Sequence, residues 1–158
     1  MRIGHGYDIH RLKQGGRLVL AGVVVSTEIS PDAHSDGDVV LHAIVDAILG
    51  AIGAGDIGEH FSDQDPRWKD ADSAVFVRHA LKLARNAGFV VGNADVSILA
   101  ERPRLKAFKP AMKAALEAIL SAPANIKAGT NEACDAIGRG EAIACHAVVL
   151  LLKDAAQG

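Results

Sequence analysis

Asp8 and His10 stand two residues apart near the start of the chain, and a third candidate ligand, His42, follows within residues 36–42. Residues two apart in an extended strand project from the same face, so Asp8 and His10 would point to one side of a sheet. An imidazole from a helix could then complete a set of three ligands. A catalytic divalent metal uses three protein ligands and keeps one position for substrate, whereas structural zinc usually takes four. The pattern therefore predicts a metal site that does chemistry.

Simpler interpretations exist for each of these residues. Asp8 and His10 alone could be unrelated surface residues, and a single helical histidine is more often hydrogen-bonded than a metal ligand. His42, however, lies off the apolar stripe of its predicted helix, with Asp38 and Asp46 one turn away on either side. Either carboxylate could fix the His42 tautomer, as metal-bound imidazoles usually require. The combination favours a metal site, and an Asp/His/His set suits zinc while also accepting manganese or cobalt.

Two other segments offer groups that suit a phosphorylated ligand. His34 and Ser35 precede the same predicted helix, whose free backbone N–H groups could receive an anion, although an ordinary helix cap is equally compatible. Thr130 and Glu132 follow a short predicted strand. A carboxylate beside a hydroxyl can hold magnesium against a diphosphate, although the same residues could form a simple turn. Both segments are therefore candidates for phosphate binding.

The loop over residues 100–106 is basic, with Arg102, Arg104 and Lys106. Such a loop is most often a solvated surface, but it also suits a nucleotide or phosphate pocket. Arg139 and Glu141 flank one glycine and could form an ion pair, which contributes little stability if it is solvated. The sequence contains no Gly-x-Ser-x-Gly motif, P-loop or dinucleotide fingerprint, so we expect no protein nucleophile of the hydrolase type.

The elements that must position these groups follow from hydrophobic periodicity. Their order predicts an α+β fold, a single domain over residues 1–158 built as a two-layer sandwich of a mixed β-sheet and helices. The segment 55–69 is expected to be a loop with Phe61 and Trp68 exposed, and residues 61–68 to act as a lid. Strands are predicted at 1–10, 18–20, 23–25, 90–100, 125–128 and 143–153, and helices at 38–53, 72–86 and 110–121, the second capped by Asp72 and Ser73.

Composition limits the possible partners and compartment. The chain has 158 residues, of which 49% are hydrophobic, and its formal net charge of −2 argues against nucleic acid or an anionic membrane as a partner. Cys134 and Cys145 are not in a CxxC spacing, which indicates a reducing compartment. The apolar run 143–152 is too short to span a bilayer. We therefore expect a cytoplasmic protein without a leader segment.

The chain resembles the 2-C-methyl-D-erythritol 2,4-cyclodiphosphate synthase family of the non-mevalonate isoprenoid pathway. The likeness runs over nearly the whole chain, and the first signature is highly specific. The segments that carry the resemblance are 2–10, 33–38 with His42, 55–58, Phe61 with 63–66, and 138–141 with the final strand.

The resemblance implies a phosphorus–oxygen lyase. The enzyme would convert 4-diphosphocytidyl-2-C-methyl-D-erythritol 2-phosphate to the 2,4-cyclodiphosphate and CMP, by metal-assisted intramolecular phosphoryl transfer. It also implies a homotrimer around a central channel, with active sites between neighbouring subunits. Two alternatives are a metal-dependent phosphohydrolase and a non-catalytic trimer that binds metal or nucleotide.

The resemblance further implies a role for each candidate residue. Zinc or another divalent transition metal would bind Asp8, His10 and His42, and magnesium or manganese would bind Glu132. His34 and Thr130 would be catalytic, by stabilising the transition state. The substrate would contact Asp8, His10, His34, Ser35, Asp56, Ile57, Gly58, Phe61, Ser62, Asp63, Gln64, Asp65, Ala100, Pro103, Arg104, Leu105, Lys106, Gly129, Thr130, Asn131, Glu132, Ala136 and Arg139.

The chain departs from the family pattern in three segments. Gly129 and Asn131 flank a single threonine where relatives often have two or three, and Asp135-Ala136 replaces a common Gly-Phe. Arg104 stands where lysine is frequent, which keeps the charge but changes the donor geometry.

Overall fold

A computed structural model describes residues 1–62 and 64–155 of the chain. Its main sheet has five strands in the order β4-β1-β7-β5-β6. The β5–β6 pair is parallel and the other pairs are antiparallel, so the predicted mixed sheet is confirmed. A separate hairpin joins two short strands, β2 and β3. The strands are β1 (Arg2–Gln14), β2 (Leu18–Leu20), β3 (Val23–Ser26), β4 (Ile29–Pro31), β5 (Phe89–Leu99), β6 (Ala124–Gly129) and β7 (Ala142–Lys153).

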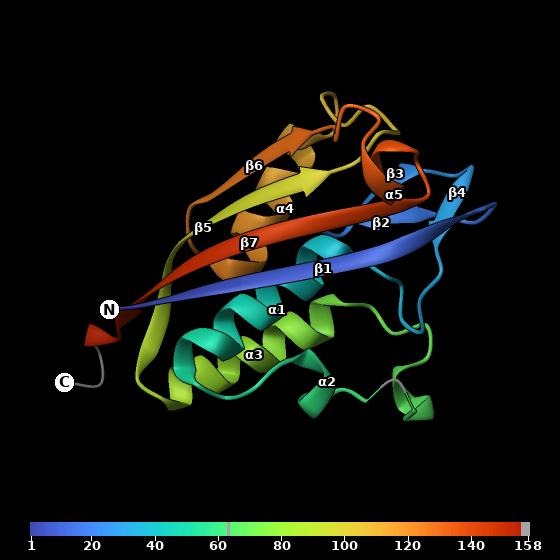
Figure 1. The fold of residues 1–158 in the computed structure, drawn as a ribbon. Helices are drawn as coiled ribbons and strands as arrows, with labels where there is room; N and C mark the ends of the chain where they lie inside the picture. The colour runs from blue at the N-terminus through green and yellow to red at the C-terminus, as the bar shows by residue number, and fades with distance from the viewer. Residues whose placement is uncertain (63, 156–158) are drawn as a thin grey trace.

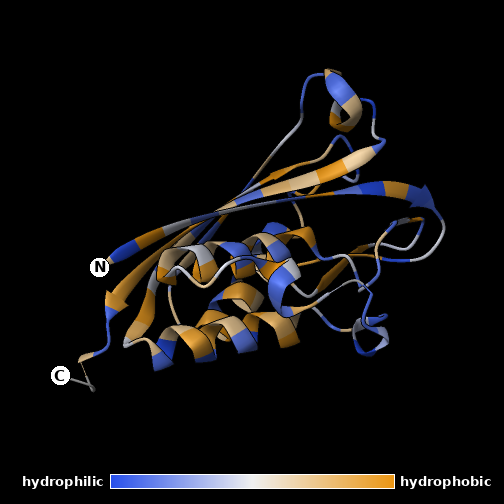
Figure 2. Ribbon diagram, turned by 60° about the horizontal axis from the view of Figure 1, so that its bottom comes forward, coloured by the Kyte–Doolittle hydropathy of each residue, from blue (hydrophilic) through white to orange (hydrophobic). Residues whose placement is uncertain are grey.

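The longer helices cover one face of this sheet, which gives the predicted two-layer α+β architecture (Figure 1). Hydrophobic and hydrophilic residues alternate along the helical layer, as expected for helices with one side on a core (Figure 2). The central helix is buried almost all round and lies directly on β1 and β7. The three longer helices are α1 (Val39–Ile52), α3 (Ala74–Asn86) and α4 (Lys109–Leu120).

Several short elements fall in segments predicted as loops. β4 pairs with the far end of β1, which is longer than predicted because residues Leu12–Gln14 gain partners there. The helices α2 (Ile57–His60) and α5 (Asp135–Gly138) are one turn each, as is the 3₁₀ turn Pro66–Trp68. A single turn is too short to show a hydrophobic period, so sequence periodicity could not reveal these elements.

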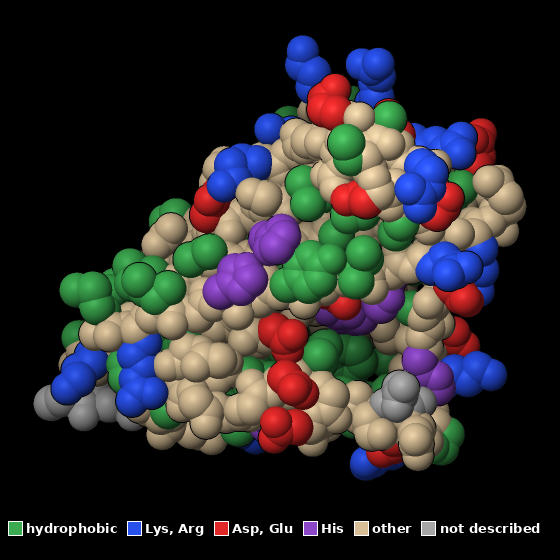
Figure 3. All heavy atoms as spheres, in the orientation of Figure 1, with side chains coloured by type: hydrophobic (Ala, Val, Ile, Leu, Met, Phe, Trp, Pro, Cys, Tyr) green, Lys and Arg blue, Asp and Glu red, His purple; other side chains and the backbone are tan. Residues whose placement is uncertain are grey.

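Successive side chains of β1 point to opposite faces of the sheet, so the candidate metal ligands lie on the face that the helices cover. Gly4, Gly6, Asp8 and His10 point toward the helices, whereas the residues between them point outward. On the outward face, apolar and imidazole side chains gather over β1 and β7 (Figure 3). The exposed large apolar residues of these two strands include Ile3, Tyr7, Ile9, Val148 and Leu152.

No helix in the described part of the chain combines the length and apolar character needed to cross a membrane.

Candidate active site

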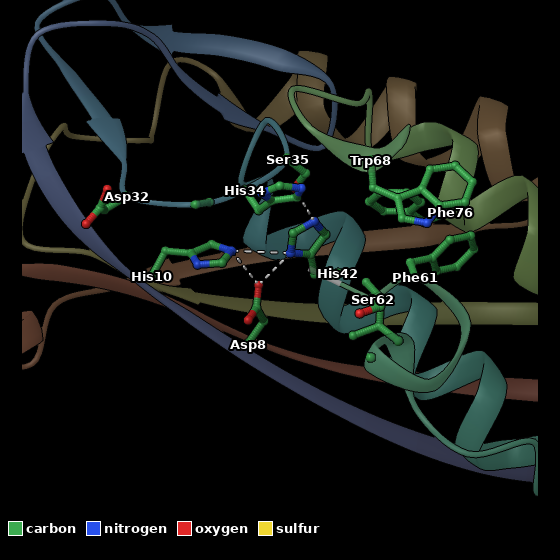
Figure 4. Close-up of a pocket in the computed structure, with 13 residues that line it drawn as sticks. Asp8, His10, Asp32, His34, Ser35, His42, Phe61, Ser62, Trp68 and Phe76 are labelled. Carbon is green, nitrogen blue, oxygen red and sulfur yellow. Dashed lines mark hydrogen bonds and ion pairs between the residues drawn. The ribbon is translucent and has the colours of Figure 1, made fainter. Parts of the chain in front are cut away.

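The three predicted metal ligands meet between β1 and α1. Asp8 and His10 project from the helix-facing side of β1, and His42 extends from the first turn of α1 toward them (Figure 4). Asp8 Oδ2 lies 2.9 Å from His42 Nδ1 and 3.1 Å from His10 Nε2. The two histidine nitrogens are 3.3 Å apart. The structure thus brings together the three side chains that the sequence predicted.

These distances fit a divalent transition metal. Ligand bonds of about 2.0–2.1 Å in a tetrahedral arrangement place neighbouring donor atoms about 3.3 Å apart. The observed triangle of 2.9, 3.1 and 3.3 Å is close to that spacing without any rearrangement. One carboxylate and two imidazoles are also a donor set suited to zinc and its neighbours in the first transition series.

The surroundings of Asp8 favour the ionised form of its carboxyl group. Burial alone would raise the pKa of Asp8, but its hydrogen bonds to His10 and His42 outweigh burial and hold that pKa well below its usual value. Burial would lower the pKa of His42, but the hydrogen bond to Asp8 raises it instead. Asp8 is therefore an ionised ligand at neutral pH, and its charge attracts cations to this point.

The opposite side of the His42 ring contacts groups that were not expected there. His42 Nε2 lies 2.8 Å from Ser73 Oγ and 3.2 Å from Ser35 Oγ. The Ser73 hydroxyl in turn donates to Asp36 Oδ1. The sequence had offered Asp38 or Asp46 for this role, and that prediction is wrong, because both carboxylates accept hydrogen bonds from backbone N–H groups instead.

Asp38 is the N-cap of α1 and is fully buried. Its Oδ1 accepts from the N–H groups of Val40 and Leu41, each at 3.1 Å, and its two oxygens also accept from Ala21 and Gly22 in the β2–β3 turn. These bonds occupy the N–H groups that the sequence had offered to an anion. The helix-cap interpretation is therefore confirmed, and Asp38 connects the hairpin to α1.

A cavity of about 460 Å³ opens beside the three ligands (Figure 4). His34 lies at its rim, where its Nε2 donates to the backbone oxygen of Asp65 at 3.4 Å. Ser62 also lines the cavity, while Asp63 lies outside the described residues. The full lining is Asp8, His10, Asp32, Ala33, His34, Ser35, His42, Ile57, Gly58, Phe61, Ser62, Trp68 and Phe76.

One wall of this cavity is an aromatic cluster. Phe61 packs against Phe76 with ring centroids 4.4 Å apart, and Trp68 contacts both rings edge-on at 5.2 and 5.7 Å. Phe61 is buried and Trp68 half-buried. The expectation that both are exposed was wrong, because α3 supplies Phe76 as a partner that the local sequence could not indicate.

The one-turn helix α2, which carries Ile57 and Gly58, is held by two carboxylates. Asp46 of α1 accepts from the Ile57 N–H at 2.8 Å, and Asp56 caps α2 by accepting from Glu59 N–H at 3.1 Å. Gly58 and Ile57 thereby face the cavity, while Asp56 remains exposed beside it. Two residues of the predicted substrate segment, Ile57 and Gly58, thus line the same cavity as the metal ligands.

A second cavity, of about 190 Å³, lies at the C-terminal ends of β5 and β6. Glu132 stands near it with a left-handed φ of 50°, and its Oε1 accepts a 3.0 Å hydrogen bond from the Thr130 hydroxyl. The cavity is lined by Ala100, Glu101, Pro103, Arg104, Leu105, Ala128, Gly129 and Thr130. Arg104 of the basic loop and the Thr130 segment therefore line one cavity, separate from the first, whereas Arg102 and Lys106 lie outside its lining.

The remaining predicted contacts lie outside both linings. Arg139 Nε lies 2.8 Å from Glu141 Oε1, so the predicted ion pair forms, on the exposed surface. Asn131 donates to Asp135 at 2.9 Å. Gln64, Asp65, Lys106 and Ala136 also lie outside these linings, and Ala136 packs against the small cluster of Ile137, Ala142 and Ala144.

The residues that sequence reasoning missed are Asp32, Ala33 and Phe76 in the lining, with Ser73 and Asp36 behind His42. Ser73 was predicted only as a helix cap. Asp72 provides that cap, since its Oδ1 accepts from the Ala74 N–H at 2.8 Å, while the Ser73 hydroxyl turns toward His42. Residues 42 and 73 are far apart in the sequence, so only the tertiary structure reveals this contact.

Comparison with known proteins gives one consistent result. The sequence matches the YgbB family over residues 1–152. The 2-C-methyl-D-erythritol 2,4-cyclodiphosphate synthase of Geobacter metallireducens is 53% identical over 154 residues, covering 96% of this chain and 98% of that protein. The chloroplastic synthase of Oryza sativa is 47% identical, covering 96% and 70%. A solved CDP complex of Plasmodium falciparum IspF aligns with a TM-score of 0.84 at 34% identity, over 96% of each chain.

Proposed function

The chain belongs to the YgbB family, and from this we propose that its two cavities are two halves of an active site completed between neighbouring subunits. Its activity is that of 2-C-methyl-D-erythritol 2,4-cyclodiphosphate synthase, a lyase of isoprenoid biosynthesis that forms a cyclic diphosphate and CMP. These relatives do not favour the alternatives, a phosphohydrolase or a non-catalytic binding protein.

The convergence of Asp8, His10 and His42 at one cavity carries the proposal. These side chains would hold zinc or another divalent transition metal, and three ligands leave a position open for a substrate oxygen. When bound, the ion supplies positive charge beside phosphate groups that otherwise repel each other. The depressed pKa of Asp8 supports this role, because the carboxylate stays ionised throughout the physiological range.

The substrate we propose is 4-diphosphocytidyl-2-C-methyl-D-erythritol 2-phosphate. An oxygen of its 2-phosphate attacks the β-phosphorus, and the bond from that phosphorus to CMP breaks. Since both reacting groups are anionic, the protein has to align them and neutralise their charge. His34 and Ser35 line the metal cavity and would donate to phosphate oxygens, while Asp56, Ile57, Gly58 and the 61–65 segment would hold the methylerythritol portion.

The second cavity would hold the nucleotide. Residues 100–106 would surround the cytosine, and Thr130 would donate to the diphosphate. Glu132 would bind magnesium or manganese together with phosphate oxygens, because this ion is usually held by one or two carboxylates plus substrate phosphates. Solved CDP complexes of two synthases support a CDP-linked substrate.

A homotrimer would join the two halves. His34 and Thr130 lie in different cavities of one chain, so a shared substrate would need a neighbouring copy. The outward face of β1 and β7 supports this assembly, because its apolar residues Ile3, Tyr7 and Ile9 are open to solvent in a single chain. This face would line the central channel, near Arg139. The cytoplasmic location remains a prediction, since the plant relative is chloroplastic.

Product analysis tests the chemistry. The purified protein with the CDP-linked substrate and magnesium should yield the cyclic diphosphate and CMP, which phosphorus NMR distinguishes from linear phosphates. In oxygen-18 water the cyclic product should carry no solvent oxygen. A linear phosphate containing solvent oxygen would instead identify a hydrolase.

Subunit mixing tests the shared site. His42→Ala and Thr130→Ala damage different cavities, so each homo-oligomer should have little activity. Co-expressed in equal amounts, they should regain about a quarter of wild-type activity, because random mixing pairs two intact halves at one interface in four. Activity no higher than that of the separate variants would place each complete site within one chain.

A further inference from the structure

Ser73 is a helix N-cap residue whose hydroxyl is used elsewhere. Serine at this position commonly accepts a hydrogen bond from an N–H of the first helical turn. Here the hydroxyl lies 2.8 Å from His42 Nε2 and also contacts Asp36 Oδ1, while Asp72 caps α3. Ser73 is completely buried, so these contacts replace any bond to water. The arrangement indicates a role directed at His42 and not at the helix.

The direction of these hydrogen bonds follows from the donor inventory. The Asp36 side-chain oxygens accept from the backbone N–H groups of Asp38 at 3.2 Å and Ser73 at 3.0 Å, and they also accept from the Ser73 hydroxyl. The Ser73 hydroxyl proton therefore points to Asp36. The remaining lone pair of Ser73 Oγ faces His42, so His42 Nε2 carries a proton and donates it.

A proton kept on Nε2 leaves Nδ1 as the nitrogen that can give up its proton to a metal. Without an ion Nδ1 donates to the Asp8 carboxylate, and a bound ion would displace that proton and use the Nδ1 lone pair. His42 Nδ1 is the atom that faces Asp8 Oδ2 at 2.9 Å and His10 Nε2 at 3.3 Å. Ser35 Oγ, at 3.2 Å from Nε2, accepts a hydrogen bond from the Gly37 N–H and can accept from the same Nε2–H.

We propose that Ser73 and Asp36 are positioning residues that hold His42 in the Nε2–H tautomer with Nδ1 directed at the metal position. This inference rests on the proposed metal site and adds a chain of contacts from α3 through the 36–38 loop. Neither residue touches the metal or the substrate. Hydrogen-bonded partners behind a metal ligand typically change metal affinity by about 10–100-fold when they are removed.

Zinc affinity of the metal-free protein gives a direct test, measured by competition with a chromophoric chelator. Ser73→Ala should weaken zinc binding about 10–100-fold, and Asp36→Asn should weaken it in the same direction. The matched control is Asp72→Ala, which removes the neighbouring cap of α3 and leaves the His42 contacts in place. This control should lower thermal stability but keep wild-type zinc affinity.

The outcomes separate the two hypotheses. If His42→Ala binds zinc as tightly as wild type, the metal site itself is refuted, and the positioning role falls with it. If His42→Ala loses zinc but Ser73→Ala binds normally, only the positioning role is refuted. An equal loss of zinc affinity in Asp72→Ala would also refute it, because loosening of α3 would then explain the effect.

A tautomer measurement on the wild type needs no variant and remains informative if Ser73→Ala fails to fold. Long-range proton–nitrogen NMR of the zinc-loaded protein should show the His42 ring proton on Nε2. A proton found on Nδ1 would overturn the proposal.

Discussion

Gly6 in β1 lies against the backbone of Ala43 in α1, so closely that a Cβ on Gly6 would stand 1.9 Å from the Ala43 carbonyl oxygen. Gly4 has the same relation to Ala47, at 1.7 Å. The helix therefore lies on bare backbone at two successive inward positions of the strand. This close approach brings His42, next to Ala43, within hydrogen-bond distance of Asp8 on the same strand.

Gly6→Ala should therefore destabilise the protein and displace His42 from Asp8 and His10. We expect a loss of about 1–3 kcal/mol in unfolding free energy, the usual range for overpacking, together with weaker zinc binding. Urea unfolding and zinc competition would measure both effects. Gly50→Ala is the matched control, because a Cβ there would meet no described atom within 4 Å. Wild-type stability in Gly6→Ala would contradict this account of the packing.

His42→Ala should remove the metal and nearly all turnover, while the fold is retained. The reason is that two ligands remain of the three, whereas other side chains form the hydrophobic core. Metal analysis after gel filtration, with circular dichroism, would check this. His79→Ala replaces an exposed helical histidine that is not among the three ligands, and it should keep its metal content. Full metal content in His42→Ala would exclude the assigned site.

Glu132→Gln should weaken the response to magnesium while zinc content stays normal. The amide keeps the shape of the side chain but removes the charge that would attract a second cation beside the diphosphate. A magnesium titration of turnover should shift to higher concentration. Glu28→Gln, on an exposed surface, serves as the comparison. An unchanged titration would show that Glu132 does not hold this ion.

Asp38 should give stability an unusual pH dependence. Burial raises its pKa from 3.8 to about 6 in the folded protein. Between these values the folded state keeps a proton that the unfolded state has lost, so this carboxyl makes the unfolding free energy fall as pH rises. Urea unfolding of the wild type between about pH 4 and 7 should show this fall in unfolding free energy. In Asp38→Asn the contribution of this carboxyl should disappear. In Asp70→Asn, which changes an exposed carboxylate, unfolding free energy should vary with pH as in the wild type. The same pH dependence in the wild type and both variants would disprove the assignment to Asp38.

Much of the candidate site could be predicted because it depends on local periodicity. The two-residue period of a strand places Asp8 and His10 on one face, and the apolar stripe of residues 39–52 predicts α1 with His42 off that stripe. These relationships involve neighbours in sequence, whose geometry the backbone conformation dictates. The opening and closing motifs also carried the family resemblance, which the comparisons confirm.

Only the tertiary structure decided which distant groups surround those ligands. Ser73 looked like a helix cap and Phe61 like an exposed loop residue, yet packing of α3 against α1 places Ser73 behind His42 and Phe76 against Phe61. In the same way, His34 and Thr130 fall in separate cavities of one chain. Such contacts depend on how elements pack across long sequence separations, and no local pattern of residue types encodes that packing.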